Sequence, residues 1–281
     1  TLFLNGTNAG TTATPVIPAS LLGSNTAATP VPHFLARSGD ASQPGFQGAL
    51  DEARFYSRAL SAAEVLALQP PIAPTGSVAI AGTLHVDLRA GHPSAATSAW
   101  TNLGSLGGVF TPVTAPAPTA LVDNYPAVSL NGAQAWSGPV TVADIHGGSD
   151  RSIEVWAHNP ALSDEETVVS LGHRGSTRRN LAFNFGANGF YGVGAATHWA
   201  DDVAWITAPS AGAWHHLVYT YATNVVRVYV DGTLSVTHTL GGPLDTFAGE
   251  PINIGCQRDS ANGARSFFFN GSINTVRIHG G

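Results

Sequence analysis

Lysine and methionine are absent from the 281 residues, cysteine occurs once, and charged residues make up only 11%. Without lysine the chain has no Walker A lysine, no Schiff-base lysine and no lysine general base. All 12 positive charges are therefore arginines, and with 18 acidic residues the formal net charge is −6. This negative balance, without a basic stripe, argues against a nucleic-acid partner.

Long hydrophobic runs are also missing. No apolar stretch approaches the roughly 18 residues of a membrane-spanning helix, so we expect no membrane span. The single Cys256 cannot form a disulfide within the chain, and we expect it to be a buried residue inside a strand. Low charge with abundant Ala, Thr, Gly and Ser is typical of an extracellular or cell-surface protein. Because methionine is absent even at position 1, we expect this sequence to be part of a longer protein.

Short β-strands account for most of what is present. Turn residues separate them, such as Thr223-Asn224 and Asp231-Gly232, and this pattern predicts an all-β sandwich or barrel. One short helix is predicted at residues 61–68, with Ser61 as its N-cap. The predicted strands are residues 153–157, 167–171, 181–185, 190–193, 214–221 and 225–230.

An internal repeat organises the chain. Residues 2–6 (LFLNG) match residues 228–232 (VYVDG), and residues 46–56 (FQGALDEARFY) match residues 269–279 (FNGSINTVRIH). The order and spacing of the two copies are nearly the same. We therefore divide the chain into residues 1–69, the C-terminal part of one unit, a linker at 70–76, and a nearly complete second unit at 77–281.

These motifs resemble laminin-G-like domains of the concanavalin A-like lectin/glucanase superfamily, in their bacterial extracellular form. The first unit carries FQGALDEARFYSRALSAAEVLAL, and the second carries RSIEVWAHNP, EETVVSLGHRG and AGAWHHLVYTY followed by VRVYVDG. The resemblance implies a jelly roll of two antiparallel sheets, here in tandem with the first copy incomplete. The superfamily contains both binding modules and glucanases, so the resemblance alone does not assign a function.

Catalytic patterns are missing. There is no G-x-S-x-G motif, and the two-carboxylate strand pattern E-x-D-x-E of the glucanase branch does not occur. The nearest acidic group, Asp164-Glu165-Glu166, is consecutive, and we expect it to be a solvated turn before the strand at 167–171. We therefore do not expect an enzyme.

The resemblance also implies a structural Ca²⁺ held by oxygen ligands, one of them an Asp at the start of the last strand. Asp51 occupies that place in the first unit, and the uncharged Asn274 occupies it in the second. A turn or edge role for Asp51 is the alternative.

The segment at residues 173–205 is the candidate ligand site. Sugars bind aromatic faces and carboxylates, so loop tryptophans beside aspartates suit a glycan ligand. The alternative is that Trp199 and Trp205 pack against the sheet while the arginines of this segment form ion pairs with Asp201 and Asp202. We expect Trp100, Trp156 and Trp214 to lie in the core. The candidate ligand-binding residues are His173, Arg174, His198, Trp199, Asp201, Asp202 and Trp205.

The leading functional expectation is a non-catalytic, lectin-like adhesion module that is secreted or on the cell surface and binds glycan or protein. One alternative is a structural repeat of a surface layer, fibre or large adhesin. Another is an ancillary domain of a secreted hydrolase.

Residues 1–69 supply about four strands of a unit of about a dozen, which would leave strand edges and apolar faces uncovered. We expect another chain, or the missing N-terminal part, to complete them, and the protein to form a homo-polymer in the first case. Light scattering of the purified chain tests this expectation. A monodisperse monomer with residues 1–69 well ordered would contradict it.

Overall fold

The computed structural model describes residues 2–4, 7–10, 56, 58, 61, 82–96, 99–115, 117–195 and 201–281. The chain divides into two compact units, Thr1–Pro70 and Pro71–Gly281. In the first unit, β1 (Leu2–Leu4) pairs antiparallel with β2 (Thr7–Gly10). The predicted helix at 61–68, apart from Ser61, and the repeat segment at 46–56, apart from Tyr56, lie outside the described residues, so the tandem arrangement stays a prediction.

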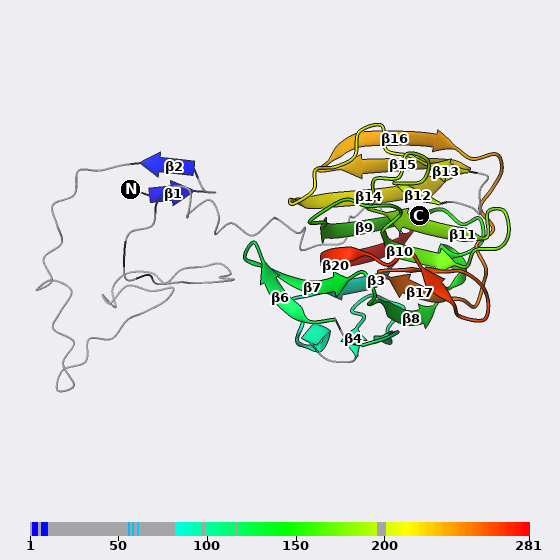
Figure 1. The fold of residues 1–281 in the computed structure, drawn as a ribbon, viewed down its shortest axis with the longest axis horizontal. Helices are drawn as coiled ribbons and strands as arrows, with labels where there is room; N and C mark the ends of the chain where they lie inside the picture. Colours follow the sequence, from blue (N-terminus) through cyan, green and yellow to red (C-terminus); the bar gives the residue numbers. More distant parts are fainter. Residues whose placement is uncertain are drawn as a thin grey trace, which may run out of the picture. The chain divides into compact units, whose positions relative to one another are not determined.

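The second unit contains two large antiparallel sheets, as the sequence predicts. Strands β16, β15, β14, β9 and β20 follow one another across the first of them (Figure 1). The far edge of β20 pairs with β7 and then with β3. The eight strands are β3 (Leu84–Arg89), β6 (Thr119–Val122), β7 (Tyr125–Asn131), β9 (Arg151–His158), β14 (Trp214–Ala222), β15 (Val225–Val230), β16 (Thr233–Thr239) and β20 (Asn270–Gly280).

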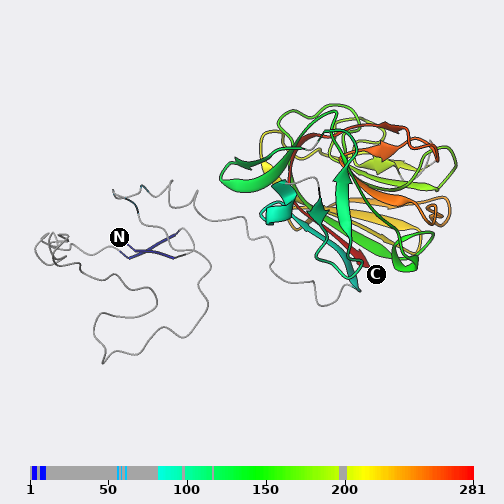
Figure 2. The same ribbon diagram turned by 90° about the horizontal axis from the view of Figure 1, so that it is seen from below.

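The second sheet has six strands, in the order β11-β10-β17-β8-β5-β4, and Figure 2 shows the same body turned by 90°. Its strands are β4 (Trp100–Thr101), β5 (Val109–Pro112), β8 (Trp136–Val140), β10 (Thr167–Gly172), β11 (Asn180–Asn184) and β17 (Pro251–Ile254). Two small pairs join loops: β12 (Gly194–Ala195) with β13 (Asp202–Val203), and β18 (Gln257–Arg258) with β19 (Arg265–Ser266).

Helical structure among the described residues is limited to two 3-10 turns, η2 (Pro93–Ala96) and η3 (Ala143–Ile145). No helix in this part of the chain is long and apolar enough to cross a membrane.

Side chains alternate along each strand between the core, which lies between the two sheets, and the outer face of the sheet. On β9, Ile153 and Val155 are fully buried between the sheets, whereas Glu154 and Trp156 face outward. Trp100 lies in the core as expected, with its ring centroid 5.6 Å from that of Trp136. The same expectation is wrong for Trp156 and Trp214, which are half-buried on the outer face of the eight-stranded sheet.

The hairpin of β14 and β15 follows the sequence prediction closely. Thr223 and Asn224 both have positive φ, 49° and 65°, as a two-residue type I′ hairpin turn requires. The predicted strand at 190–193 is wrong, because the side chain of Asn188 accepts hydrogen bonds from the backbone N–H of Phe190 and folds the chain into a turn. Cys256 is buried as expected, but it lies in the bend between β17 and β18.

One end of the core is closed by a buried cation. Arg151 is fully buried and donates hydrogen bonds to the carbonyl oxygens of Ile145 and Gly147 and to Thr246 Oγ1. Burial lowers its pKa to about 10, so the guanidinium remains charged at neutral pH. This single side chain ties η3 and the loop at 241–250 to the start of β9.

Replacement of Arg151 should therefore destabilise the protein. Arg151→Ala leaves these oxygens buried without donors, and we expect it to lower the free energy of unfolding by about 3 kcal/mol. Chemical denaturation followed by tryptophan fluorescence measures this loss. The exposed Arg227 is the matched control, and Arg227→Ala should change the stability by no more than about 0.5 kcal/mol. Equal effects of the two substitutions would contradict the role of Arg151.

Candidate functional site

The predicted ligand residues at 173–205 occupy separate environments. Asp201 accepts a hydrogen bond from Arg178 Nη1 at 3.0 Å and another from the backbone N–H of Gly241 at 2.8 Å. This ion pair is the alternative arrangement that the sequence allowed. Asp201 therefore anchors its loop to the segment that follows β16.

His173 and Trp205 are also engaged in packing. The His173 ring stacks on Phe247, with centroids 3.9 Å apart, and its Nδ1 lies 3.3 Å from Glu250 Oε1. Trp205 is half-buried and packs against the hydrophobic core. His198 and Trp199 lie outside the described residues. Ligand binding by this set of residues stays a prediction.

Asp202 and Arg174 belong to a polar cluster that includes Glu165. Glu165 is 3% exposed and accepts a hydrogen bond from Gln257 Nε2 at 2.8 Å. The buried Glu166 Oε2 accepts bonds from Asn159 Nδ2 and the Ser163 backbone N–H. The expectation of a solvated acidic turn at 164–166 is therefore wrong for Glu165 and Glu166. The donor to Glu165 comes from a residue 92 positions away, whereas the donors to Glu166 lie in the loop just before it.

Burial raises the pKa of Glu165 from 4.5 to about 7, although Gln257 and Arg174 oppose this shift. Burial likewise raises the pKa of Asp202 from 3.8 to about 6, again against the attraction of Arg174. Both carboxyl groups therefore change their charge between about pH 5 and pH 8.

The residues around Asn274 do not fit a calcium site. Its Nδ2 donates to the carbonyl oxygen of Pro126 at 2.7 Å, and its Oδ1 accepts from Thr275 Oγ1 at 2.7 Å. Among the described residues, no group of three or more His, Cys, Asp or Glu is gathered to hold a metal ion. Asp51 lies outside the described residues, so calcium at that position stays a prediction.

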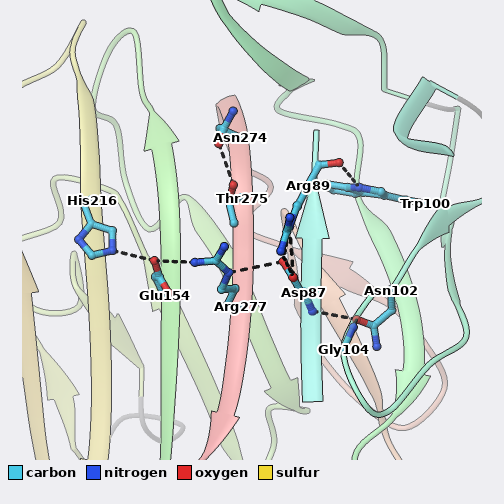
Figure 3. A network of polar contacts seen from close by, with 10 residues as sticks. All are labelled: Asp87, Arg89, Trp100, Asn102, Gly104, Glu154, His216, Asn274, Thr275 and Arg277. Carbon is cyan, nitrogen blue, oxygen red and sulfur yellow. Dashed lines mark hydrogen bonds and ion pairs between the residues drawn. The ribbon is translucent and has the colours of Figure 1, made fainter. Parts of the chain in front are cut away.

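The outer face of the eight-stranded sheet carries an ionic network that the sequence did not reveal (Figure 3). We define this network as Arg89, Asp87, Arg277, Glu154 and His216. In the register of the sheet, Arg277 of β20 lies directly opposite Asp87 of β3 on one side and Glu154 of β9 on the other. The side chains therefore form a line across four strands.

Arg277 is at the centre of the network. Its Nε lies 3.5 Å from Asp87 Oδ1, and its Nη1 lies 3.5 Å from Glu154 Oε1. Arg89 Nη2 donates to Asp87 Oδ2 at 2.6 Å, and Glu154 Oε1 lies 3.0 Å from His216 Nε2. The side chains of Asp87, Arg277 and Glu154 are 4%, 3% and 7% exposed.

Burial disfavours ionisation of Glu154, but the hydrogen bond from His216 and the charge of Arg277 outweigh it and lower the pKa of Glu154. The central carboxylate is therefore ionised at neutral pH. Its charge is balanced by the guanidinium beside it.

Two half-buried tryptophans lie on the same face. Trp156 stacks on His216 with centroids 5.0 Å apart. Trp214 makes an edge contact with Tyr125 at 5.8 Å, and its Nε1 donates to the carbonyl oxygen of Val122. Because Tyr125 and Val122 belong to the β6–β7 hairpin, the tip of this hairpin reaches from the β20 edge to β14.

Sequence reasoning missed this face, although a signal existed. In IEVWA the period-2 alternation places Glu154 and Trp156 on one face, opposite to Ile153 and Val155. The partner Arg277 is 123 residues from Glu154, and only the fold brings it there.

This face combines flat aromatic surfaces with fixed hydrogen-bonding groups. Aromatic rings stack on the C–H surfaces of sugars, while carboxylate and guanidinium groups bind hydroxyls. The arrangement suits a binding surface. The two packed antiparallel sheets form a β-sandwich of the lectin type.

Family comparison supports this class. A laminin G family model, described as the concanavalin A-like lectin/glucanases superfamily, matches residues 131–281. The chain belongs to this superfamily. Among curated proteins, none matches the sequence.

Among solved structures, one with a TM-score above 0.5 supports the same fold, and two others are similar at lower scores. Domain 4 of AbnA, a GH43 extracellular arabinanase from Geobacillus stearothermophilus, in complex with arabinotriose, is 16% identical, with a TM-score of 0.52 over 72% of this chain and 94% of that domain. The binding domain of Paraclostridial Mosquitocidal Protein 1 is 14% identical, with a TM-score of 0.44 over 70% of this chain and 49% of that one. Trypanosoma rangeli sialidase is 15% identical, with a TM-score of 0.44 over 70% of this chain and 31% of that enzyme.

The Glu165 carboxyl group should make stability depend on pH. Its folded pKa of about 7 exceeds the ordinary 4.5, so the unfolded chain loses this proton first as the pH rises. The contribution of Glu165 is fully present below about pH 4.5 and decreases up to about pH 7. We expect Glu165→Gln to raise the melting temperature at pH 8 and to leave it nearly unchanged at pH 4.

Thermal melts across this pH range test the expectation. Asp245 is 61% exposed and pairs with Arg179, so Asp245→Asn is the matched control and should leave the pH dependence as in the unmodified chain. An unchanged pH dependence in Glu165→Gln would contradict the assignment.

Proposed function

We propose that the protein is a non-catalytic, extracellular glycan-binding module and that its binding surface is the outer face of the eight-stranded sheet. The observation that carries the proposal is the half-buried Trp156, stacked on His216 beside the buried ionic network. A ring fixed in this way offers a flat surface at little entropic cost, and the polar groups next to it are already oriented.

Family membership supports a binding role, since the superfamily includes lectins. The arabinanase domain of the same fold was solved with a bound arabinotriose. That domain is part of an extracellular enzyme, which also suits the alternative of an ancillary domain in a secreted hydrolase.

For the outer face, the proposal of a non-catalytic role is supported by the way its two buried carboxylates are used. Glu154 and Asp87 are both paired to arginines. A glycosidase needs one carboxylic acid and one free carboxylate on either side of the scissile bond. The network of the outer face provides two carboxylates that are both paired to arginines instead.

Removal of the aromatic surface should weaken glycan binding. We expect Trp156→Ala or Trp214→Ala to weaken glycan affinity by about tenfold or more, as loss of a central aromatic anchor does. A glycan array followed by calorimetric titration of the full chain measures this. Melting curves confirm that each variant is folded.

Two control variants locate the site. Phe190 is 78% exposed outside this face, so Phe190→Ala removes an aromatic surface and should leave affinity unchanged. Asp202→Asn tests the loop segment predicted from sequence. Binding that is lost in Asp202→Asn but kept in Trp156→Ala would move the site to the loops, and repetition with a chelator tests calcium separately.

A further inference from the structure

The short strands β12 and β13 form a pair of their own, outside the two large sheets. Two residue pairs join them, Gly194 with Val203 and Ala195 with Asp202. The backbone N–H of Val193 donates to the carbonyl oxygen of Val203 at 3.0 Å, and these two residues are 0% and 2% exposed. The pair therefore covers part of the core, and so short a ladder can open while the large sheets stay intact.

A carboxyl group without a donor begins β13. Asp202 is half-buried, and in the part of the chain that the structure describes its Oδ1 is buried and has no hydrogen-bond partner. A charged oxygen in such a place is costly, because no donor replaces the water that it has lost. The closed strand pair therefore favours the uncharged form of Asp202.

Glu165, which lies just before β10, is the second carboxyl group of this cluster. It is 3% exposed, and Gln257 Nε2 of β18 donates to it at 2.8 Å. The negative charge of Asp202 acts on Glu165 and disfavours its ionisation. We define Glu165 and Asp202 as the carboxyl pair.

The charges around the carboxyl pair do not balance it. Arg174 attracts both members, but its Nη1 also lies 3.8 Å from Asp259 Oδ1. Asp164 and Asp201 each repel one member, and Arg178 is already engaged with Asp201 at 3.0 Å. When both members are ionised, two negative charges in a largely buried place share a guanidinium that a third carboxylate also attracts.

Burial is the main reason why this pair binds protons more tightly in the folded chain. It raises the pKa of Glu165 to about 7 and that of Asp202 to about 6, against ordinary values of 4.5 and 3.8. An open arrangement therefore loses both protons before the closed one does. The stabilisation of the closed arrangement is fully present below about pH 4 and is lost as the pH rises through about 7.

We propose that the carboxyl pair is a pH-sensitive clasp, which keeps β12 and β13 closed over the core in acid and releases them as both members ionise. Release exposes Val203 and loosens Trp205, which packs against the core two residues later. The clasp goes beyond the proposed glycan-binding function, which uses the outer face of the other large sheet.

Hydrogen exchange of the full chain tests the clasp. Protection factors correct for the intrinsic effect of pH on exchange, and the amide of Val193 reports on the strand pair because it donates to Val203. We expect its protection factor to fall by about tenfold or more between about pH 5 and about pH 8. Amides in the middle of β9 and β14 serve as the internal reference and should fall much less.

Neutral variants of the carboxyl pair provide the second readout. Asp202→Asn and Glu165→Gln each remove one charge and keep the size of the side chain. In either variant the protection of the Val193 amide at about pH 8 should rise toward its value at about pH 5. Asp245→Asn removes an exposed carboxylate that pairs with Arg179, so it is the matched control and should leave the fall unchanged. Melting curves confirm that each variant is folded.

Three results would overturn the inference. Equal protection of the Val193 amide at both pH values would show that no clasp titrates in this range. An equal fall in β9 and β14 would show that these charges act on global stability instead. An unchanged fall in both neutral variants would place the titrating group elsewhere. Glycan binding is measured separately, so each of these results leaves the proposed function standing.

Discussion

The pairing of β20 is the constraint on which the rest of the second unit depends. This strand has eleven residues and pairs with β9 along one edge and with β7 and then β3 along the other. Its register places Val276 and Ile278 in the core and Arg277 on the outer face between two acids. A shift of one residue would bury the guanidinium between the sheets, so the ionic network and the apolar core specify the same register.

The network illustrates what a buried ion pair contributes. Desolvation of three charged side chains offsets most of their mutual attraction, so the network is weak evidence for stability. Its effect is to hold Glu154 ionised and Arg277 immobile beside a stacked tryptophan. Orientation of these groups is already complete before a ligand arrives, which reduces the entropy lost on binding.

Much of the fold could be predicted from local patterns. The hairpin at 214–230 follows from β-branched and aromatic residues around a Thr-Asn turn, and the family resemblance rests on motifs that lie in these strands. The site is less predictable: a strand position predicts a buried Trp156, because a tryptophan in a strand is usually buried. Three consecutive acidic residues predict a solvated turn at Glu165, and the partner Gln257 that it meets when buried is 92 residues away.

The sequence by itself determined the all-β class and which residues of a strand share a face, because alternation of side chains is a property of the extended backbone. Only the tertiary structure decided what lies beside each of these residues. Arg277 meets Asp87 across 190 residues, and Trp214 meets Tyr125 through the β6–β7 hairpin. Partners so distant are chosen by strand order and register, which arise from packing of the whole core and leave no mark in a local segment.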